Sequence, residues 1–188
     1  MTSKPPIRHP EWQARTDGSA RYAGDSRPPG LLAGAVLRSP HPHARIISVD
    51  TTAAEHSPGV HAVVTAADLP DRRYTDYGTS DRPALARDTV RFIGQEVAAV
   101  AAATESQARA ALAGIRVRYH PLPAATTLRD GGPVAVSLDR TFGDLDTAHD
   151  HGTNTVSARY RFGIQAHACM EPHTTLAQWD ADERRLHI

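Results

Sequence analysis

The run VAAVAAA at residues 97–103 is the feature that most constrains the fold of this chain. An uninterrupted apolar stretch of this length is typical of a strand that is buried in a sheet. A helix should follow, because Thr104 and Gln107 have the spacing of a capping box. The apolar face of that helix would consist of Ala108, Ala111 and Leu112. Gly114 is placed to end the helix, and residues 114–119 then predict a further strand.

Four shorter segments before this run also have the pattern of strands. They are residues 31–39, 44–50, 60–66 and 90–92. Thr52 and Glu55 have the form of a second capping box, which predicts a short helical turn, and Gly94 marks a turn or a close approach. Residues 69–86 are charged and polar, with neither a helical nor a strand period, so we expect a surface loop. Together these elements predict one α/β (α+β) domain that ends near residue 123.

The two flanks of this domain are expected to be less regular. The first thirty residues are polar and rich in proline and glycine, which predicts an extended lead-in. After the domain, residues 121–154 have few periodic apolar residues, which predicts a linker of about thirty residues that crosses between domains.

The last part of the chain predicts the opening of a second, β-rich domain. Alternating apolar side chains indicate a new strand, and they are Val156, Ala158, Tyr160 and Phe162. Residues 174–179 and 185–188 have the pattern of a hairpin pair. Because two or three strands cannot bury a core alone, we expect this β-rich part to be incomplete.

The overall composition excludes several classes of function. Lys and Arg number 21 and Asp and Glu also number 21, so no basic field attracts nucleic acid. The single cysteine permits neither an internal disulfide nor an iron–sulfur cluster. No segment is apolar and long enough for a membrane span, and the N-terminus has no signal-peptide pattern. We therefore expect a cytoplasmic protein, although export on the signal of a partner remains compatible with this sequence.

Candidate functional side chains are concentrated in FGIQAHACMEPH, residues 162–173. His167 and His173 are irregularly spaced across a proline, so direct metal ligation is not expected, and Cys169 has the setting of a small buried hydrophobe. Gln165 offers a donor and an acceptor without titrating, which suits a site that holds a metal oxo group or a substrate oxygen. Its amide could equally cap the end of a strand. The spacing of these residues alone defines no reaction.

Two further histidine pairs are also explained without a metal ion. His41 and His43 flank a proline in a turn, where no carboxylate or cysteine stands at ligand spacing, so local hydrogen bonding is expected. His149 and His151 fall in the linker, where a solvated loop is expected. Metal ligands are therefore not predicted for this chain.

Six segments together resemble a known family. They are DGSARYAGD, GLLAGAVLRSPHPHARIISVDTTAA, PGVHAVVTAADLP, DTVRFIGQEVAAVAA, RVRYHPLPA and IQAHACMEPHTTLAQWD. Their order and spacing resemble the molybdopterin-binding large subunits of the xanthine dehydrogenase and aldehyde oxidase family. The resemblance implies a hammerhead-type mixed sheet with flanking helices at residues 17–123, after an extended lead-in at residues 1–16. It further implies a linker at residues 124–152 and the truncated start of the molybdopterin-binding domain at residues 153–188.

The resemblance also implies an activity and a set of cofactors. Members of this family hydroxylate aldehydes or N-heterocycles with oxygen derived from water. They use a molybdenum–molybdopterin cofactor, which this chain would share with a partner chain. The 2Fe-2S clusters and FAD are expected on other subunits. The implied partners are the remaining part of the molybdenum-binding subunit, an iron–sulfur subunit, an FAD subunit and the small-molecule substrate.

One residue of this sequence matches a functional position of the family, and a second is a weaker candidate. Gln165 matches the glutamine that hydrogen-bonds the apical oxygen of molybdenum, and Glu171 is a second catalytic candidate. The stretch Met170-Glu171-Pro172-His173 looks like the variant of bacterial aldehyde-oxidising members, whereas xanthine dehydrogenases tend to carry Leu-Glu-Thr. This variant mildly favours an aldehyde substrate.

One departure from the family pattern leaves alternatives open. The catalytic glutamate of the family, its substrate-orienting arginine and its glycine-rich pterin segments follow the point where this sequence ends. The chain is therefore expected to act only with a partner that supplies them. The alternatives are a non-catalytic interaction module of such a complex and a truncated remnant without function.

Overall fold

The computed structural model describes residues 11–76, 79–127, 130, 139–152, 154, 156–163 and 165–188. The chain divides into two compact units. We call Gly30–Thr147 the sheet unit, and we call Met1–Pro29 together with Ala148–Ile188 the terminal unit.

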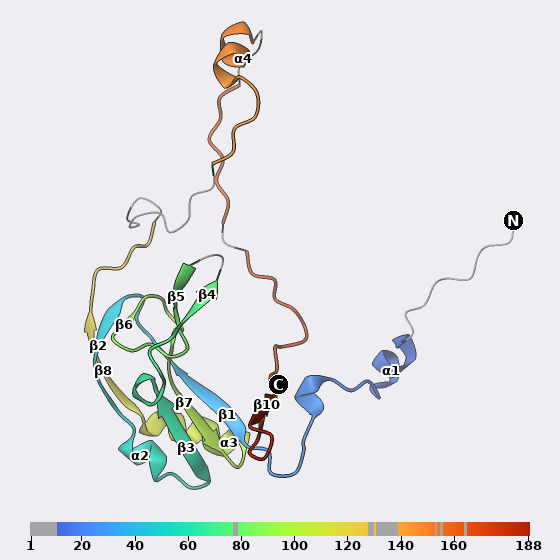
Figure 1. Cartoon of the computed structure of the whole chain (residues 1–188), viewed down its shortest axis with the longest axis vertical. Coiled ribbons are helices and arrows are strands. Elements are labelled where there is room, and N and C mark those ends of the chain that lie inside the picture. Colours follow the sequence, from blue (N-terminus) through green and yellow to red (C-terminus); the bar gives the residue numbers. More distant parts are fainter. Residues whose placement is uncertain are drawn as a thin grey trace, which may run out of the picture. The chain divides into compact units, whose positions relative to one another are not determined.

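The centre of the sheet unit is an antiparallel sheet in the order β1-β7-β3. Its strands are β1 (Ala33–Arg38), β7 (Glu96–Ala102) and β3 (Val60–Thr65). β7 corresponds to the apolar run of the sequence, and it pairs with a strand on each side (Figure 1). Val97, Ala98 and Val100 of β7 are buried, although successive side chains of a strand point to opposite faces. The strand is thus covered on both faces, as its uninterrupted apolar sequence predicts.

A second antiparallel sheet has the order β6-β2-β8. Its strands are β6 (Thr89–Val90), β2 (Ala44–Asp50) and β8 (Arg116–Pro121). Val49 of β2 and Val117 of β8 pack against both clusters of buried side chains. One cluster contains Val100 and the other contains Val97, and these two side chains lie on opposite faces of β7. The core of the sheet unit therefore lies on both faces of β7. The expected α+β fold class is confirmed, and every strand pair described is antiparallel.

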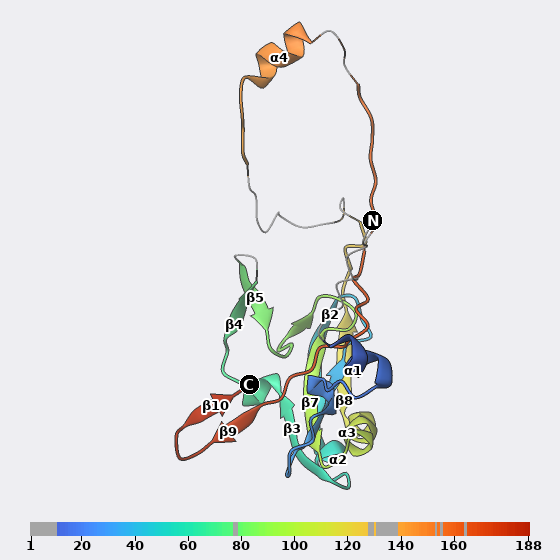
Figure 2. The ribbon, with the colours of Figure 1, turned by 90° about the vertical axis from the view of Figure 1, so that its right-hand side faces the viewer.

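Two short helices flank the central sheet, α2 (Thr52–Glu55) and α3 (Glu105–Ala111). α3 lies against β1, β7 and β3 (Figure 2). Its start is as predicted, because the Thr104 hydroxyl accepts a hydrogen bond from the Gln107 N–H at 3.2 Å. α3 passes into a 3₁₀ turn, Leu112–Gly114, that lies against α2. A Cβ on Gly114 would stand 2.8 Å from the backbone nitrogen of Ala54, so close approach explains this glycine.

The second capping box differs from the prediction. α2 is present, but Thr51 precedes it, and the Thr51 side chain caps no backbone N–H. Asp50 accepts a hydrogen bond from the Thr52 N–H at 3.1 Å instead. The carboxylate at the end of β2 therefore satisfies a backbone donor at the start of this helix.

The prediction of a surface loop for residues 69–86 is wrong. This segment contains a two-stranded hairpin, β4 (Arg73–Asp76) paired with β5 (Thr79–Pro83), and its last residues Leu85 and Ala86 are buried. A hairpin of polar residues is held by backbone hydrogen bonds, which leave no apolar period in the sequence. In the strand expected at residues 90–92, only Val90 is included, and Phe92 is half-exposed before the turn at Gly94.

The terminal unit contains short elements. They are α1 (Trp12–Asp17), a 3₁₀ turn η1 (Ala23–Asp25), β9 (Gln178–Asp180) and β10 (Arg185–His187). β9 and β10 form the predicted hairpin. The prediction of an extended lead-in is wrong for residues 12–17, which form α1. Residues 1–10 lie outside the described residues. A further helix, α4 (Leu145–His151), lies in the predicted linker and contains His149 and His151, which corrects the loop expected there.

The strand predicted from Val156, Ala158, Tyr160 and Phe162 is absent from the described residues 156–163. Val156 is 87% exposed and Phe162 is 90% exposed, so the alternating pattern has no sheet to bury it within the described chain. No helix of the described residues has both the length and the apolar character that crossing a membrane requires.

Candidate functional site

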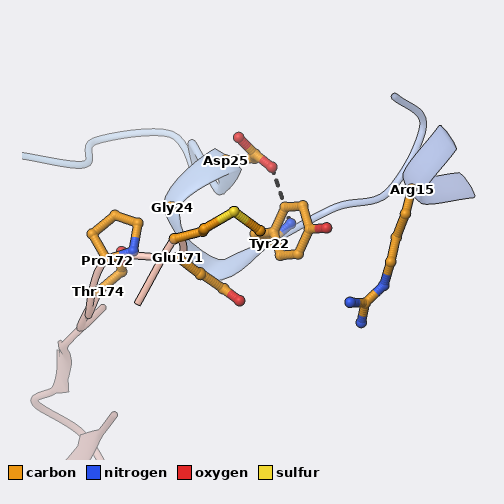
Figure 3. Close-up of a pocket in the computed structure, with 8 residues that line it drawn as sticks. Arg15, Tyr22, Gly24, Asp25, Glu171, Pro172 and Thr174 are labelled. Carbon is orange, nitrogen blue, oxygen red and sulfur yellow. Dashed lines mark hydrogen bonds between the residues drawn. The ribbon is translucent and has the colours of Figure 1, made fainter. Parts of the chain in front are cut away.

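The terminal unit contains a cavity of about 540 Å³ between two segments that are distant in sequence. This volume is in the range of small-ligand sites. The lining residues are Arg15, Tyr22, Gly24, Asp25, Met170, Glu171, Pro172 and Thr174. Figure 3 shows Tyr22 between Arg15 on one side and Glu171 with Pro172 on the other. Glu171, a candidate from the sequence, is therefore part of the cavity.

The N-terminal wall of the cavity is fixed by local hydrogen bonds. α1 ends at Gly18, which has a left-handed φ of +78° and thus ends the helix in the usual glycine conformation. The chain then folds back, and the Ala20 N–H donates to the Ala14 carbonyl at 2.9 Å. In η1 the Tyr22 N–H donates to an Asp25 carboxylate oxygen at 3.0 Å. Together these bonds hold the backbone on either side of the Tyr22 ring.

The second wall is the stretch from Met170 to Thr174. The chain reaches it through Ala168, whose φ of +46° marks a sharp turn. A Cβ on Gly24 would lie 3.4 Å from the Thr174 hydroxyl oxygen, which is an ordinary contact distance. The two walls are therefore close together at this point, with room for a Cβ at position 24.

The charges around the cavity are unequal. The Arg15 guanidinium forms an ion pair with Glu11, 3.1 Å from Nη2 to Oε2, outside the cavity lining. This hydrogen bond is the main cause that raises the pKa of Arg15 above its ordinary value, and the charge of Glu171 contributes less. Asp25 and Glu171 add two carboxylates to the lining. The cavity therefore has more negative than positive charge.

Gln165 is exposed and is not among the residues that line this cavity. The residue before it, Ile164, lies outside the described residues. The role of Gln165 thus stays a prediction, and Gln165 and Glu171 are not brought together in one cavity. Cys169 is exposed, which corrects the buried setting expected for it, because its neighbours pack against no described core.

The two histidines of the turn at residues 41–43 have separate contacts. The His43 Nδ1 lies 2.6 Å from the Pro123 carbonyl oxygen, and the His41 ring meets the Tyr119 ring edge-on at 4.9 Å. The prediction of local hydrogen bonding is wrong for the His43 ring, because its partner Pro123 lies 80 residues further along the chain. These contacts fasten the end of β8 beside the start of β2.

A carboxylate–histidine group that sequence reasoning missed lies on the β9-β10 hairpin. The ligand atoms of Asp180, Glu183 and His187 all lie within 4.8 Å of one another. One Asp180 oxygen already accepts hydrogen bonds from the Asp182 and Glu183 N–H groups at 3.0 and 2.9 Å. This bonding explains the position of Asp180 in the turn without a metal ion. The arrangement therefore gives no reason to assign a cofactor.

Sequence reasoning also missed the N-terminal wall. Arg15, Tyr22 and Asp25 carry no motif of their own. The segment DGSARYAGD within the family resemblance contains Tyr22 and Asp25, whereas Arg15 lies outside it. No periodicity connects that segment to Glu171. Only the three-dimensional structure shows that they line the same cavity.

Comparison with known protein families shows a match to one of them. The family described as "Aldehyde oxidase and xanthine dehydrogenase, a/b hammerhead domain" matches residues 17–123, which is more than half of the chain. The chain therefore belongs to the aldehyde oxidase and xanthine dehydrogenase family, the class that the fold and the sequence segments indicated.

Individual relatives extend the similarity beyond the matched domain. A probable xanthine dehydrogenase subunit of Bacillus subtilis (strain 168) is 37% identical over 185 residues, covering 91% of this chain and 24% of the relative. The aldehyde oxidoreductase molybdenum-binding subunit PaoC of Escherichia coli (strain K12) is 32% identical, covering 92% of this chain and 24% of its own length. The chain thus spans about a quarter of the length of these relatives.

A solved structure supports the same fold. The crystal structure of quinoline 2-oxidoreductase from Pseudomonas putida 86 superposes with a TM-score of 0.61 and 35% sequence identity. The superposition covers 65% of this chain and 17% of that chain. The relatives thus include a molybdenum-binding subunit of an aldehyde oxidoreductase, the neighbours include a quinoline 2-oxidoreductase, and this chain corresponds to a limited part of each.

Proposed function

We propose that this chain is the N-terminal part of a molybdenum hydroxylase that oxidises an aldehyde or an N-heterocycle. The observation that carries this proposal is the similarity to a molybdenum-binding subunit over 92% of the chain. In the proposed reaction, a substrate C–H bond becomes C–OH with a water oxygen, while two electrons and two protons leave. The molybdenum–molybdopterin cofactor supplies this two-electron chemistry when it is bound.

The proposed domain organisation follows the family. Residues 17–123 form the hammerhead domain, residues 124–152 connect, and residues 153–188 begin the cofactor-binding domain. The remaining part of the molybdenum-binding subunit supplies most contacts to the cofactor. Iron–sulfur and FAD subunits then carry the electrons away, so the chain acts as a component of a complex. The subunit names of several relatives support the proposal that the chain belongs to a complex of several subunits.

Gln165 is the proposed contact of this chain to the cofactor. Its amide can donate a hydrogen bond to an apical oxygen and remains neutral at every working pH. A fixed neutral donor stabilises an anionic oxygen without exchanging a proton with it. Gln165 is exposed in this chain, so its side chain is accessible to a group held mainly by other residues. The Glu171 carboxylate, six residues further on, is the second candidate.

The proposal is tested by purification through a tag on this chain after co-expression with the rest of the molybdenum-binding subunit. Molybdenum in the eluate, measured by mass spectrometry, and aldehyde-dependent dye reduction support the proposal. A partner that arrives without molybdenum supports a non-catalytic interaction module. The exposed apolar residues Tyr160 and Phe162 would serve either role as part of a binding surface.

The role of Gln165 is tested by Gln165→Ala in the assembled complex. Loss of an outer hydrogen bond to a metal site lowers activity about tenfold to hundredfold, whereas molybdenum content and subunit ratio should stay the same. Gln13→Ala, which removes an exposed amide from α1, is the matched control. Unchanged turnover of the Gln165 variant would exclude the proposed hydrogen bond.

A further inference from the structure

We propose that the cavity between residues 15–25 and 170–174 receives an arginine side chain of the remaining part of the molybdenum-binding subunit. The proposal rests on the proposed function, because it takes that subunit as the source of the side chain. It assigns to Glu171 the role of binding a guanidinium group instead of a contact to the cofactor.

The charge of the cavity favours a cation. Asp25 and Glu171 are two carboxylate residues of the lining, and Arg15 is the only cation among the residues that line the cavity. Arg15 is already paired with Glu11 at 3.1 Å. Among the described residues, no hydrogen bond or ion pair within bonding distance involves Glu171, whereas one Asp25 oxygen accepts the Tyr22 N–H. The Glu171 carboxylate is therefore the acceptor that is open to an incoming donor.

The apolar part of the lining favours a planar cation. The Tyr22 ring lines the cavity and is 41% exposed, and Pro172 lies beyond it (Figure 3). Met170 also lines the cavity. A guanidinium group stacks on an aromatic ring and sheds water more readily than an ammonium group. It can also donate two parallel hydrogen bonds to one carboxylate. Tyr22 and Glu171 thus offer a ring face and an acceptor to the same group.

The wall that holds Tyr22 is formed in advance. The Asp25 N–H donates to the Tyr22 carbonyl at 2.9 Å, and the Arg27 guanidinium donates to the Gly24 carbonyl at 2.6 Å. These bonds fix η1 before any ligand is present. A pre-organised wall loses little conformational entropy on binding, so a single side chain can be bound selectively.

The length of the relatives indicates where the arginine comes from. This chain spans 24% of the molybdenum-binding subunit PaoC, so most of such a subunit lies outside it. The cavity walls come from the part of the chain that precedes the sheet unit and the part that follows it. An arginine that enters between them would fasten both ends of this chain to the rest of the subunit.

The binding chemistry is tested by NMR on the 188-residue chain. The sequence has two methionines, Met1 and Met170, so ¹³C-methyl labelling gives one signal from the cavity. The probe is N-acetyl-arginine N-methylamide, and the control ligand is the citrulline analogue, which has the same shape without the charge. Saturable shifts of the Met170 methyl signal are expected, with about tenfold weaker binding of citrulline. Equal binding of the two ligands overturns the proposal.

Variants identify the acceptor. Glu171→Gln keeps the shape of the side chain and should weaken binding of the arginine probe about threefold, the size expected for an exposed ion pair. Glu183→Gln, on the β9-β10 hairpin, is the matched control and should leave binding unchanged. If both variants bind the probe equally well, Glu171 is not the acceptor.

The source is tested in the complex. Glu171→Gln should raise the dissociation constant between this chain and the remaining subunit about threefold and reduce its dependence on salt. An unchanged constant and an unchanged salt dependence overturn the assignment of the arginine to that subunit. If the complex contains molybdenum but the cavity does not prefer the arginine probe to the citrulline analogue, only the cavity assignment is overturned. If the cavity prefers the arginine probe but the complex contains no molybdenum, only the proposed function is overturned.

Discussion

The sheet unit and the terminal unit place their apolar side chains in opposite ways. The buried apolar residues of the described chain, from Ala44 to Ile115, all lie in the sheet unit. In the terminal unit, Val156, Phe162 and Met170 are almost fully exposed. The sheet unit thus has a core of its own, whereas the terminal unit has apolar surface that its own residues do not cover. The first is a folded domain, and the second has the character of a binding surface.

The strongest test of this comparison places a charge on a valine in each unit. Val100→Asp buries a carboxylate in the centre of β7 and should lower the free energy of unfolding by about 4 kcal/mol or more. Val156→Asp, at a side chain that is 87% exposed, should change it by less than about 0.5 kcal/mol.

Urea unfolding followed by far-UV circular dichroism measures both variants. Both tryptophans, Trp12 and Trp179, lie in the terminal unit, so their fluorescence does not report on the sheet unit directly. Similar losses for the two variants would mean that Val156 is buried in solution, and the comparison would fail.

A glycine substitution tests how tightly the sheet unit is packed. Gly114→Ala brings a Cβ to 2.8 Å from the Ala54 backbone nitrogen, and overpacking of this kind costs about 2 kcal/mol. Gly34→Ala, where a Cβ meets no atom within 4 Å, should leave stability unchanged or raise it by up to about 1 kcal/mol. The same unfolding experiment measures both. A stable Gly114→Ala protein would show that α2 and the 3₁₀ turn are loosely packed.

Helix caps sharpen the comparison between packed and unpacked helices. Thr104→Ala removes the cap of α3, which packs on the central sheet, and should cost about 1 kcal/mol. Asp144→Ala removes the carboxylate that accepts the Thr147 N–H at the start of α4. Because α4 has no buried residue, this second change should leave the main unfolding transition in place. A shift of that transition by Asp144→Ala would show that α4 belongs to the folded core.

The smallest expected effect is on acid stability. Hydrogen bonds from the Thr65 N–H and hydroxyl lower the pKa of Asp68 below its ordinary value of 3.8. A lowered pKa stabilises the folded state above the unfolded pKa, and the stabilisation is lost as the pH falls below 3.8 through the folded pKa. Asp68→Asn should therefore flatten the acid dependence of stability in that range.

Asp17→Asn is the counterpart in the terminal unit. The pKa of Asp17 is also lowered, mainly by its hydrogen bond with the Ser19 side chain. Because Asp17 lies outside the sheet unit, its substitution should not change the acid unfolding of that unit, measured by far-UV circular dichroism against pH. Equal effects of the two substitutions would show that the units unfold together.

Local patterns made much of the sheet unit predictable. β7 follows from an apolar run and the start of α3 from the Thr104–Gln107 spacing, because both signals are contained in neighbouring residues. The β4-β5 hairpin was not predictable in this way, since its pairing depends on backbone hydrogen bonds between polar residues. The family resemblance, rather than periodicity, indicated the class of protein, and that class is confirmed.

The candidate site was less predictable, for a physical reason. Glu171 could be selected from its segment, but the residues that face it, Arg15 and Tyr22, come from the other end of the sequence. The alternation from Val156 to Phe162 predicted a strand because it has the pattern of one face of a sheet. That pattern does not show whether a partner strand is present. In both cases the missing information is a contact between distant segments.

The position of β7 in the chain has a consequence for folding during synthesis. β7 is the central strand, yet it is made after both of its neighbours, and Ala33 of β1 and Val60 of β3 both pair opposite Ala102. Until residue 102 has left the ribosome, β1 and β3 have no central strand to join. Such long-range pairing is slow, because a large loop must close before any contact is gained. The nascent sheet unit should therefore fold late and in one step, with its strand edges open to chaperones until then.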